Sequence, residues 1–256
     1  MLLAIDIGNT NITLGGFLGD EPEFVARIAT DASKTSDEYA DRILQILSLH
    51  SIERAAINGV IVSSVVPPLN RVIRDAIGFA YNLNALFVGP GVKTGLNIHC
   101  DNPSSVGSDL ICASVAAYNL YGAPALIVDI GTATKMMVVD KKGTFIGVSI
   151  IPGVLMGLKA LSSSTAQLPQ ICLEAPPSVI GKNTADCMKS GVVFGNASMI
   201  DGMIDRFNGE MNCELPVLAT GGLSTVIMPH CRHKFTLDEN MVLKGLNIIY
   251  KKNKCI

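Results

Sequence analysis

The chain has few charged residues and no excess of either sign. Charged residues make up 16% of the 256 residues, and the formal net charge is −2 with a pI of about 6.1. This balance offers no general electrostatic attraction to nucleic acid or to an anionic membrane surface. We therefore expect a partner that is neither nucleic acid nor membrane.

The chain also lacks any Cys-x-x-Cys motif. Its seven cysteines are an odd number, scattered at positions 100, 112, 172, 187, 213, 231 and 255. This pattern fits a reduced, cytoplasmic protein better than a disulfide framework. One short segment, His230-Cys231-Arg232-His233, resembles a set of metal ligands. A polar loop is favoured over a zinc site there, because the sequence offers no partner cluster.

The sequence contains no convincing signal peptide or membrane span. Asp6 interrupts the first apolar run, and no basic segment precedes that run, so a secretory leader is not expected. Residues 111–128 carry no charge and have the length of a span, but they include a glycine and a proline. A helix ending near Tyr121, followed by a buried strand from Ala125, is the better interpretation.

One motif occurs twice, about half the chain length apart. In residues 2–11 an apolar run ends in Asp6, and an isoleucine, a glycine and a threonine follow. Residues 126–134 repeat the apolar run, the Asp-Ile-Gly and the hydroxyl residue around Asp129. The two aspartates are 129 − 6 = 123 residues apart in a chain of 256. Such a repeat indicates two duplicated lobes.

Each copy of the motif has a chemical interpretation. The apolar run suits a buried strand, and the aspartate places a carboxylate where that strand ends. The glycine allows a tight turn and a close approach of a ligand to backbone N–H groups. A carboxylate for a metal ion beside a donor-rich turn suits a nucleoside triphosphate. The alternative is an ordinary hairpin with Asp-Gly chemistry, which two copies at matching positions make less favoured.

The order of the expected elements predicts an α/β fold. Each half begins with three strands and continues with alternating helices and strands, which is typical of a mixed sheet covered by helices. The expected lobes are residues 1–120 and 121–256, with both aspartate turns facing an interlobe cleft. Strands are expected near 2–8, 11–18, 23–29, 55–65, 85–88, 125–129, 135–140, 144–150 and 215–219. Helices are expected near 35–47, 67–80, 108–121, 153–161, 184–208 and 239–251.

Two aspartate loops on duplicated lobes resemble the acetate and sugar kinase, Hsp70 and actin superfamily, whose lobes are actin-like or ribonuclease H-like. Further short motifs narrow this resemblance. In order, they are Val62-Ser63-Ser64-Val65-Val66-Pro67, Gly91-Val92-Lys93-Thr94-Gly95-Leu96, Asp101-Asn102-Pro103, Val106-Gly107, Thr165-Ala166-Gln167-Leu168-Pro169, Ile180-Gly181-Lys182-Asn183-Thr184 and Thr220-Gly221-Gly222-Leu223. Together they resemble type III pantothenate kinases over nearly the whole chain.

The resemblance implies a function and a set of site residues. That family phosphorylates pantothenate with ATP to give 4'-phosphopantothenate, the first step of coenzyme A biosynthesis, as a cytoplasmic homodimer that uses magnesium and potassium or ammonium. Asp109 would be the catalytic base, Asp6 would act on the magnesium side and Asp129 would bind the monovalent cation. The residues implied in ATP binding are Asp6, Ile7, Gly8, Asn9, Thr10, Asn11, Ile12, Thr13 and Thr132. Those implied in pantothenate binding are Cys100, Gly107, Ser108, Asp109, Leu110 and, from the partner subunit, Thr184.

Asp109 also has a second interpretation from the sequence itself. It lies where a helix is expected to begin, so its carboxylate could serve as the N-cap of that helix. A carboxylate that takes a proton from an alcohol in phosphoryl transfer is the role that the resemblance implies. Both readings stay open at this point.

The chain departs from the family pattern at four positions. The family has an arginine at Leu110, a tyrosine at Cys100, a threonine at Lys135 and a glycine at Val148. The ATP and metal residues are retained better than the substrate residues. A kinase for another small hydroxyl compound, a non-catalytic nucleotide-binding regulator and a phosphohydrolase of the same superfamily are therefore the alternatives to a pantothenate kinase.

Lys135 has three possible placements. Its ammonium group can fold back across the turn and take the place of the cation beside Asp129, since an opposite charge stabilises an ionised carboxylate. It can instead reach the substrate pocket and offset the arginine lost at Leu110. The simplest placement points the side chain into solvent from the start of a strand.

Overall fold

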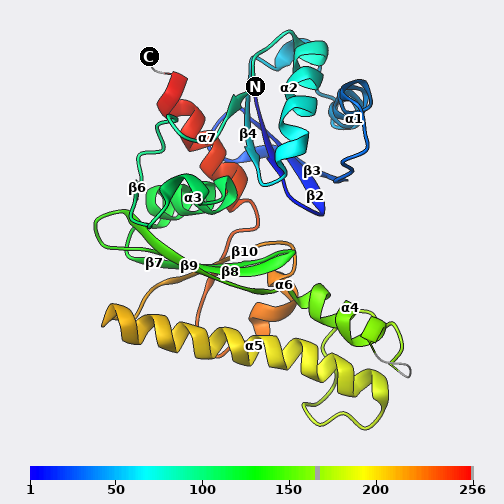
Figure 1. The fold of residues 1–256 in the computed structure, drawn as a ribbon, viewed down its shortest axis with the longest axis vertical. Helices are drawn as coiled ribbons and strands as arrows, with labels where there is room; N and C mark the ends of the chain where they lie inside the picture. The colour runs from blue at the N-terminus through cyan, green and yellow to red at the C-terminus, as the bar shows by residue number, and fades with distance from the viewer. Residues whose placement is uncertain (165–167, 255–256) are drawn as a thin grey trace. The chain divides into compact units, whose positions relative to one another are not determined.

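The structure is a computed structural model that describes residues 1–164 and 168–254. Its contacts divide the chain into two compact units (Figure 1). Unit 1 comprises residues 1–121 and 240–256, and unit 2 comprises residues 122–239. Thr165, Ala166 and Gln167 of the fifth family motif, and the seventh cysteine, Cys255, lie outside the described residues.

Unit 1 is built on a five-stranded mixed sheet in the order β3-β2-β1-β4-β5. Strands β1, β2 and β3 form antiparallel pairs in sequence. Strand β4 pairs parallel to β1, and β5 pairs parallel to β4. Their bounds are β1 Leu2–Ile7, β2 Asn11–Phe17, β3 Pro22–Ala29, β4 Gly59–Ser64 and β5 Leu86–Phe87. The predicted run of three strands at the start of the chain is confirmed, and so are the later strands of this half.

The helices of unit 1 begin where the sequence signals predict. Helix α1 (Ser36–Leu49) starts with a capping box, in which the Thr35 hydroxyl accepts from Glu38 N and the Glu38 carboxylate accepts from Thr35 N. Helix α2 (Pro67–Tyr81) starts with two prolines, which suit a first turn because the N–H groups there have no acceptor within the helix. Helix α3 spans Ser108–Ala116 and helix α7 spans Met241–Lys254. The shorter elements are η1 Arg54–Ala56, β6 Asn97–Ile98, η2 Pro103–Ser105 and η3 Ala117–Tyr121.

The two faces of the unit 1 sheet have different roles. Alternate side chains of β1, among them Leu3, Ile5 and Ile7, form one buried core with the apolar faces of α1 and α2. Helices α3 and α7 pack against each other and against β4, and α7 also packs against β1 (Figure 1). Because side chains alternate along a strand, Asp6 points to the face opposite the α1 and α2 core.

Helix α7 changes the division that the sequence suggests. Residues 240–256 are expected in the second lobe, but they are part of unit 1. The reason is packing: buried Leu243, Leu246 and Ile249 lie on α7, and this helix contacts β1, β2, β4 and α3. Ion pairs from Lys244 to Glu21 and from Lys251 to Asp20 add to this attachment.

Gly245 allows α7 to cross α3 closely, and this gives a prediction for stability. A Cβ atom at Gly245 would lie 1.9 Å from the backbone oxygen of Cys112, so Gly245→Ala should force the two helices apart. We expect a loss of about 1–3 kcal/mol in the free energy of unfolding, measured by urea denaturation. The control is Gly78→Ala in α2, where a Cβ meets nothing within 4 Å. That change should be neutral or stabilising by up to about 1 kcal/mol. Equal effects of the two changes would contradict the close crossing.

Unit 2 repeats the plan with its own sheet, in which the strands run in the order β11-β10-β7-β8-β9. Strands β7, β8 and β9 pair antiparallel in sequence, and β10 and β11 add parallel on the other side of β7. The bounds are β7 Ala125–Ile130, β8 Ala133–Val139, β9 Thr144–Pro152, β10 Val217–Thr220 and β11 Thr236–Leu237. The mixed sheet predicted for each half is therefore confirmed.

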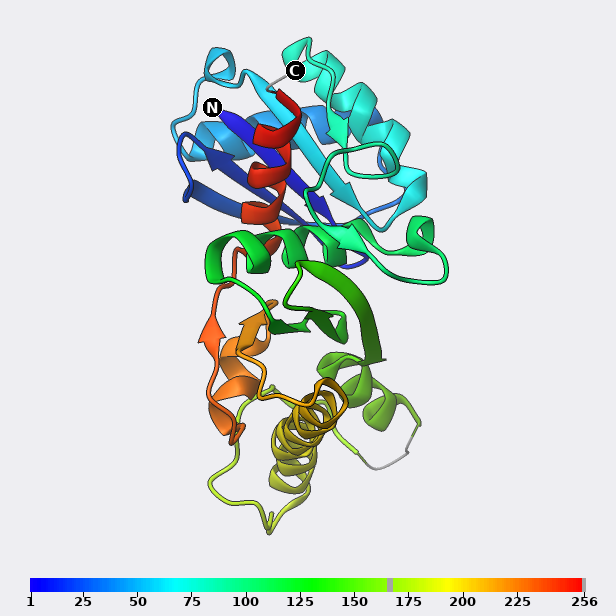
Figure 2. The same ribbon diagram turned by 90° about the vertical axis from the view of Figure 1, so that its left-hand side faces the viewer.

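The helices of unit 2 cover one face of that sheet. They are α4 Val154–Ser164, α5 Thr184–Met211 and α6 Ser224–Ile227, followed by the short turn η4 Met228–His230. Leu126, Val128 and Ile130 of β7 form the core with Val192, Ile200 and other residues of the long helix α5 (Figure 2). Asp129 alternates with these residues and points to the opposite face.

The uncharged segment 111–128 is not a single span. It runs through α3 and η3 to Tyr121 and continues as β7 from Ala125, which confirms the predicted helix end and strand start. Across the described ranges, none of the helices combines the length and the apolar character needed to cross a membrane.

Candidate active site

The first aspartate turn joins β1 to β2 in unit 1. Asp6 pairs across the strands with Thr13, and the turn is closed by a hydrogen bond of 3.0 Å from Gly8 N to Asn11 O. A second contact comes from Thr30, whose hydroxyl donates to Gly8 O at 2.6 Å and whose N–H donates to Thr10 O at 3.0 Å. The turn is thus fixed by one hydrogen bond within it and by two from Thr30, and Asp6 precedes it near the end of β1.

The predicted nucleotide residues fall into two groups in this turn. Ile7 and Ile12 are buried in the core, so only their backbone is in a position to serve a ligand. Asn9, Thr10 and Asn11 are exposed at the tip. Short polar residues and backbone groups at such a tip are suited to phosphate oxygens.

Asp109 lies in the first turn of α3 and does not cap it. The cap position is Gly107, and no side chain makes a capping hydrogen bond there. The Asp109 carboxylate instead lies close to its neighbour's backbone: a Cβ at Gly107 would come 2.5 Å from Asp109 Oδ1. The alternative role as N-cap is therefore wrong, because the helix begins one residue before Asp109.

Ser108, predicted to bind substrate, is engaged by the end of β4. Its hydroxyl oxygen lies 2.9 Å from Ser63 Oγ, accepts from Ser64 N at 2.9 Å and donates to Ser64 O at 3.1 Å. These bonds fix the start of α3 beside the end of β4. Ser108 thereby positions Asp109, its immediate neighbour.

Asp6 and Asp109 are brought together around one buried thiol. Burial raises the pKa of Cys112 well above its usual value, and the negative charges of Asp6 and Asp109 raise it further, while a hydrogen bond with Ser63 acts the other way. Strand register and hydrogen bonding place the two acids together: Asp6 lies beside Ser63 in the parallel β1–β4 pair, and Ser63 Oγ lies 2.9 Å from the hydroxyl of Ser108, the residue before Asp109. The two acidic residues that the sequence predicted for catalysis and magnesium therefore share one neighbourhood in unit 1.

The remaining predicted substrate residues have different surroundings. Leu110 is only 6% exposed and belongs to the buried run of α3. Cys100 is partly exposed in the bend after β6. Thr184 is exposed at the first position of α5, directly after Asn183, which caps that helix by accepting from Asp186 N. The Leu110 side chain is therefore part of the buried core and not of an exposed surface.

The second aspartate turn joins β7 to β8 in unit 2. Asp129 pairs across the strands with Lys135, and the turn is closed by a hydrogen bond of 3.1 Å from Gly131 N to Ala133 O. Thr132, expected to contact ATP, is exposed at the tip. The turn from β9 into α4 packs against this tip, since a Cβ at Gly153 would lie 1.9 Å from Thr132 O.

Lys135 folds onto Asp129. Its Nζ atom lies 2.7 Å from Asp129 Oδ2, and the two side chains are 18% and 11% exposed. The solvent-facing placement is therefore wrong, and the placement across the turn is confirmed. The physical reason is register: directly opposed residues of antiparallel strands project from the same face, and a lysine stem spans that distance.

Three residues around these turns were not predicted as site residues. Thr30 holds the first turn, and Ser63 contacts both Ser108 and Cys112. Gly221, with a φ of +91°, lies against Asp129, where a Cβ would come 2.5 Å from Oδ1. Ser63 and Gly221 were visible as members of family motifs, whereas Thr30 had no signal in the sequence.

The His230-Cys231-Arg232-His233 segment is a polar loop, as the sequence favoured. The buried Asp201 carboxylate accepts from the backbone N–H groups of Arg232 and His233, and His233 pairs with Asp205. Partial burial raises the pKa of Cys231 to about 12. Within residues 1–164 and 168–254, no group of three or more His, Cys, Asp or Glu side chains is arranged to hold a metal ion.

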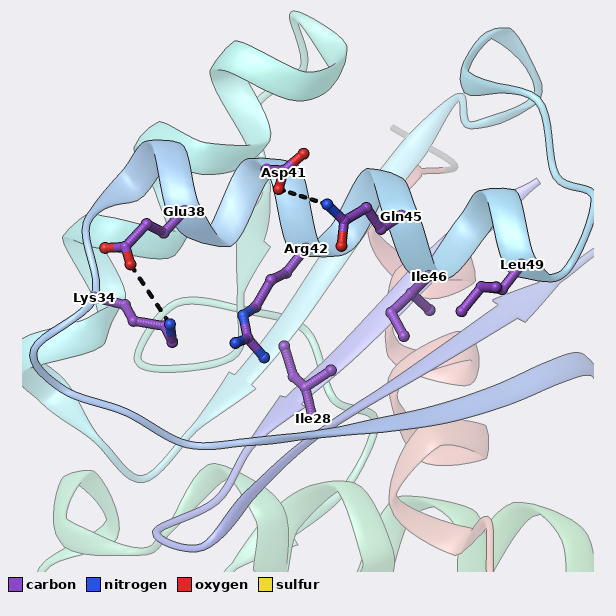
Figure 3. A pocket seen from close by; sticks show the side chains of 8 residues that line it. All are labelled: Ile28, Lys34, Glu38, Asp41, Arg42, Gln45, Ile46 and Leu49. Atoms are coloured by element: carbon purple, nitrogen blue, oxygen red, sulfur yellow. Dashed lines mark hydrogen bonds and ion pairs between the residues drawn. The ribbon is translucent and has the colours of Figure 1, made fainter.

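A hollow on unit 1 lies between α1 and β3 (Figure 3). In the hollow Lys34 forms an ion pair with Glu38, and the Gln45 amide donates a hydrogen bond to the Asp41 carboxylate. The full lining is Ile28, Lys34, Glu38, Asp41, Arg42, Gln45, Ile46 and Leu49. None of the predicted site residues lines this hollow.

Comparison with known proteins identifies the family. Residues 2–206 match the family model described as type III pantothenate kinase. The chain belongs to the type III pantothenate kinase family. A protein of that name from Moorella thermoacetica is 42% identical over 253 residues, covering 99% of this chain and all of the relative. One from Brevibacillus brevis is 41% identical over 254 residues with the same coverage.

Solved structures support the fold at low sequence identity. Component A of the (R)-2-hydroxyglutaryl-CoA dehydratase from Acidaminococcus fermentans matches with a TM-score of 0.59 and 15% identity, covering 99% of this chain and 98% of that one. The activator of the 2-hydroxyisocaproyl-CoA dehydratase from Clostridium difficile, solved with bound ADPNP, matches with a TM-score of 0.57 and 12% identity, covering 100% and 97%. These two structures therefore share the fold of this chain.

Proposed function

We propose that this chain transfers the γ-phosphoryl group of ATP to the terminal hydroxyl of pantothenate, giving 4'-phosphopantothenate for coenzyme A biosynthesis. Membership of the family supports this activity, since the family model matches residues 2–206 and a relative of that name aligns over 99% of the chain. The observation that carries the proposal is geometric: Asp6 lies beside Ser63 in the parallel β1–β4 pair, and Ser63 Oγ lies 2.9 Å from the hydroxyl of Ser108, the residue before Asp109. This puts two carboxylates in one neighbourhood of unit 1.

The proposed roles follow from the chemistry of phosphoryl transfer, which depends on positioning and charge more than on covalent catalysis. Asp109 accepts the proton of the substrate hydroxyl as its oxygen forms a bond to the γ-phosphorus. The bond from that phosphorus to the β–γ bridging oxygen breaks, and ADP leaves. Ser108, held by Ser63 and Ser64, fixes the backbone from which Asp109 projects and so acts as a positioning residue.

The nucleotide residues are proposed for each turn by itself. In unit 1, residues 8–11 present backbone and short side-chain donors for phosphate oxygens. In unit 2, Thr132 presents a hydroxyl group. Asp6 fits magnesium, because a hard carboxylate oxygen beside substrate phosphates is the usual protein contribution to such a site. Magnesium supplies charge neutralisation of the phosphates when it is bound.

The activity is tested by an ATP-dependent phosphorylation assay with pantothenate and a panel of other small alcohols. We expect turnover of pantothenate above that of every other alcohol. Preferential turnover of another alcohol would instead favour the kinase for a different hydroxyl compound, a reading that the buried Leu110 at the family's arginine position motivates. Intact nucleotide binding without turnover of any alcohol would favour the regulator.

We further propose that the chain forms a homodimer through β9 and α4. The segment Thr144–Leu158 divides between core and surface: Phe145 and Val154 are buried, but Ile150 is 66% exposed. Other exposed apolar side chains of these two elements are Ile146, Leu155, Met156 and Leu161. Exposed apolar side chains of this size favour a protein contact, and a second copy of the chain is the partner that family membership favours.

A charge on β9 should disrupt this dimer. We expect Ile150→Glu to shift the protein from dimer to monomer in sedimentation equilibrium, because an unpaired carboxylate in an apolar interface is costly. Leu18→Glu is the control, since Leu18 is 71% exposed, close to the value for Ile150, but lies in unit 1, in the turn after β2. A variant at Ile150 that remains dimeric would remove this face as the interface.

A further inference from the structure

The two aspartate turns are internal counterparts that differ in the charge of the residue paired opposite the aspartate. Each aspartate ends a central strand, and each turn is closed by an N–H donated from its glycine. Across the strands, Asp6 faces Thr13 and Asp129 faces Lys135. The position directly opposite the carboxylate is therefore neutral in unit 1 and cationic in unit 2.

The Asp129 carboxylate is enclosed on both of its oxygens. Lys135 Nζ lies 2.7 Å from Oδ2. Around Oδ1, a Cβ built on Gly221 would come within 2.5 Å and one built on Gly131 within 3.4 Å, so backbone closes that side. Asp129 as a whole is 8% exposed. A carboxylate with this little solvent needs a positive partner to stay ionised, and Lys135 provides it.

This arrangement does not fit the monovalent cation that the family resemblance implies at Asp129. A potassium or ammonium ion bound to Oδ2 would have to share that oxygen with the lysine ammonium. Two positive charges at one carboxylate oxygen repel each other strongly in a poorly solvated site. Oδ1 offers no alternative, because the backbone of Gly221 and Gly131 lies against it.

We propose that Lys135 is a built-in cation for the second turn, and that this chain therefore has no monovalent-cation site at Asp129. Lys135 acts as a positioning residue: it neutralises Asp129 and ties β8 to β7 at the base of the turn that carries Thr132. The proposal deepens the proposed kinase function as far as Thr132 serves ATP, but the ion pair and its consequence for cation binding do not depend on that activity.

The first test measures thermal stability in potassium chloride and in tetramethylammonium chloride at equal ionic strength. We expect the unaltered chain to have the same Tm in both salts. Lys135→Thr restores the neutral partner found at Thr13, so an ion can enter. Its Tm should rise by about 2–4 °C in potassium, because a ligand that binds only the folded state stabilises it. A potassium-dependent Tm in the unaltered chain, or none in Lys135→Thr, overturns the proposal.

A matched control separates this effect from the general loss of an ion pair. Lys189 pairs with Glu174 in the same unit, away from the turn. We expect Lys189→Thr to show no difference in Tm between the two salts. If Lys135→Thr does not fold, Lys135→Met keeps the stem and removes the charge, and the salt response of the unaltered chain still decides. An equal potassium response in both threonine variants would also overturn the proposal.

The second test uses phosphorylation of pantothenate in the same two salts. We expect equal turnover by the unaltered chain in both, and turnover by Lys135→Thr that is lost in tetramethylammonium and recovered in potassium. Activation of the unaltered chain by potassium contradicts the inference. A complete lack of activity in every salt would contradict the proposed function instead, and the Tm measurements would then decide the cation question alone.

Discussion

Asp109→Asn should lower kcat for pantothenate phosphorylation by roughly 10²–10⁴, the usual contribution of a positioned general base. The amide cannot accept the hydroxyl proton, but it has the size and shape of the carboxylate. Because the substitution keeps the size and shape of the side chain, the free energy of unfolding should change little. The measurements are steady-state kinetics, ATP binding by calorimetry and urea denaturation, of which only the kinetics should change strongly.

The chain offers a closely matched control for this variant. Helix α1 begins Ser36-Asp37 and helix α3 begins Ser108-Asp109, so Asp37 occupies the same helical position in the same unit. Asp37→Asn should leave kcat unchanged, because Asp37 is not part of the acidic pair near Cys112. If Asp109→Asn retains the turnover of the unaltered protein, Asp109 is not the base.

Asp6→Asn should weaken the use of magnesium-ATP by about 10–100-fold, the range found when a group that supports a bound metal is removed. The loss should appear mainly as a higher KM for magnesium-ATP or as a need for more magnesium, because the carboxylate is the hard donor on that side. Turnover should be titrated against magnesium at fixed ATP, and nucleotide binding should be measured with and without magnesium.

Asp20→Asn is the comparison for Asp6→Asn, since Asp20 is a surface carboxylate of the same unit that pairs with Lys251. It should titrate with magnesium as the unaltered protein does. Should Asp6→Asn lose only stability while its magnesium titration stays the same, Asp6 has a structural role and the assignment of the magnesium side is wrong. The two aspartate variants together separate proton transfer from metal binding.

Most of the secondary structure follows from local signals. The capping box at Thr35 and Glu38 and the two prolines that open α2 define helix starts within a few residues of chain. The apolar runs before Asp6 and Asp129 are long enough to identify buried strands. The predicted start of one strand was wrong because the short helix η1 occupies that position. Strand β4 begins at Gly59, after η1, and not near residue 55.

The candidate site could be predicted only in part. The repeat identified Asp6 and Asp129 as strand-end carboxylates, and the family motifs identified Asp109. Packing decided which side chains remain available to bind a substrate. Leu110 of α3 is buried, and the Ser108 hydroxyl is hydrogen-bonded to the end of β4. Neither outcome has a sequence signal, because each depends on residues distant along the chain.

The sequence by itself determined the duplicated α/β plan, the two aspartate turns and the family, since these rest on periodicity, short motifs and their order. Tertiary structure alone decided that α7 joins unit 1, because that depends on which sheet face buries Leu243 and Leu246. It also decided among the three placements of Lys135. Strand register sets Lys135 opposite Asp129, and a buried carboxylate that needs a positive partner holds it there.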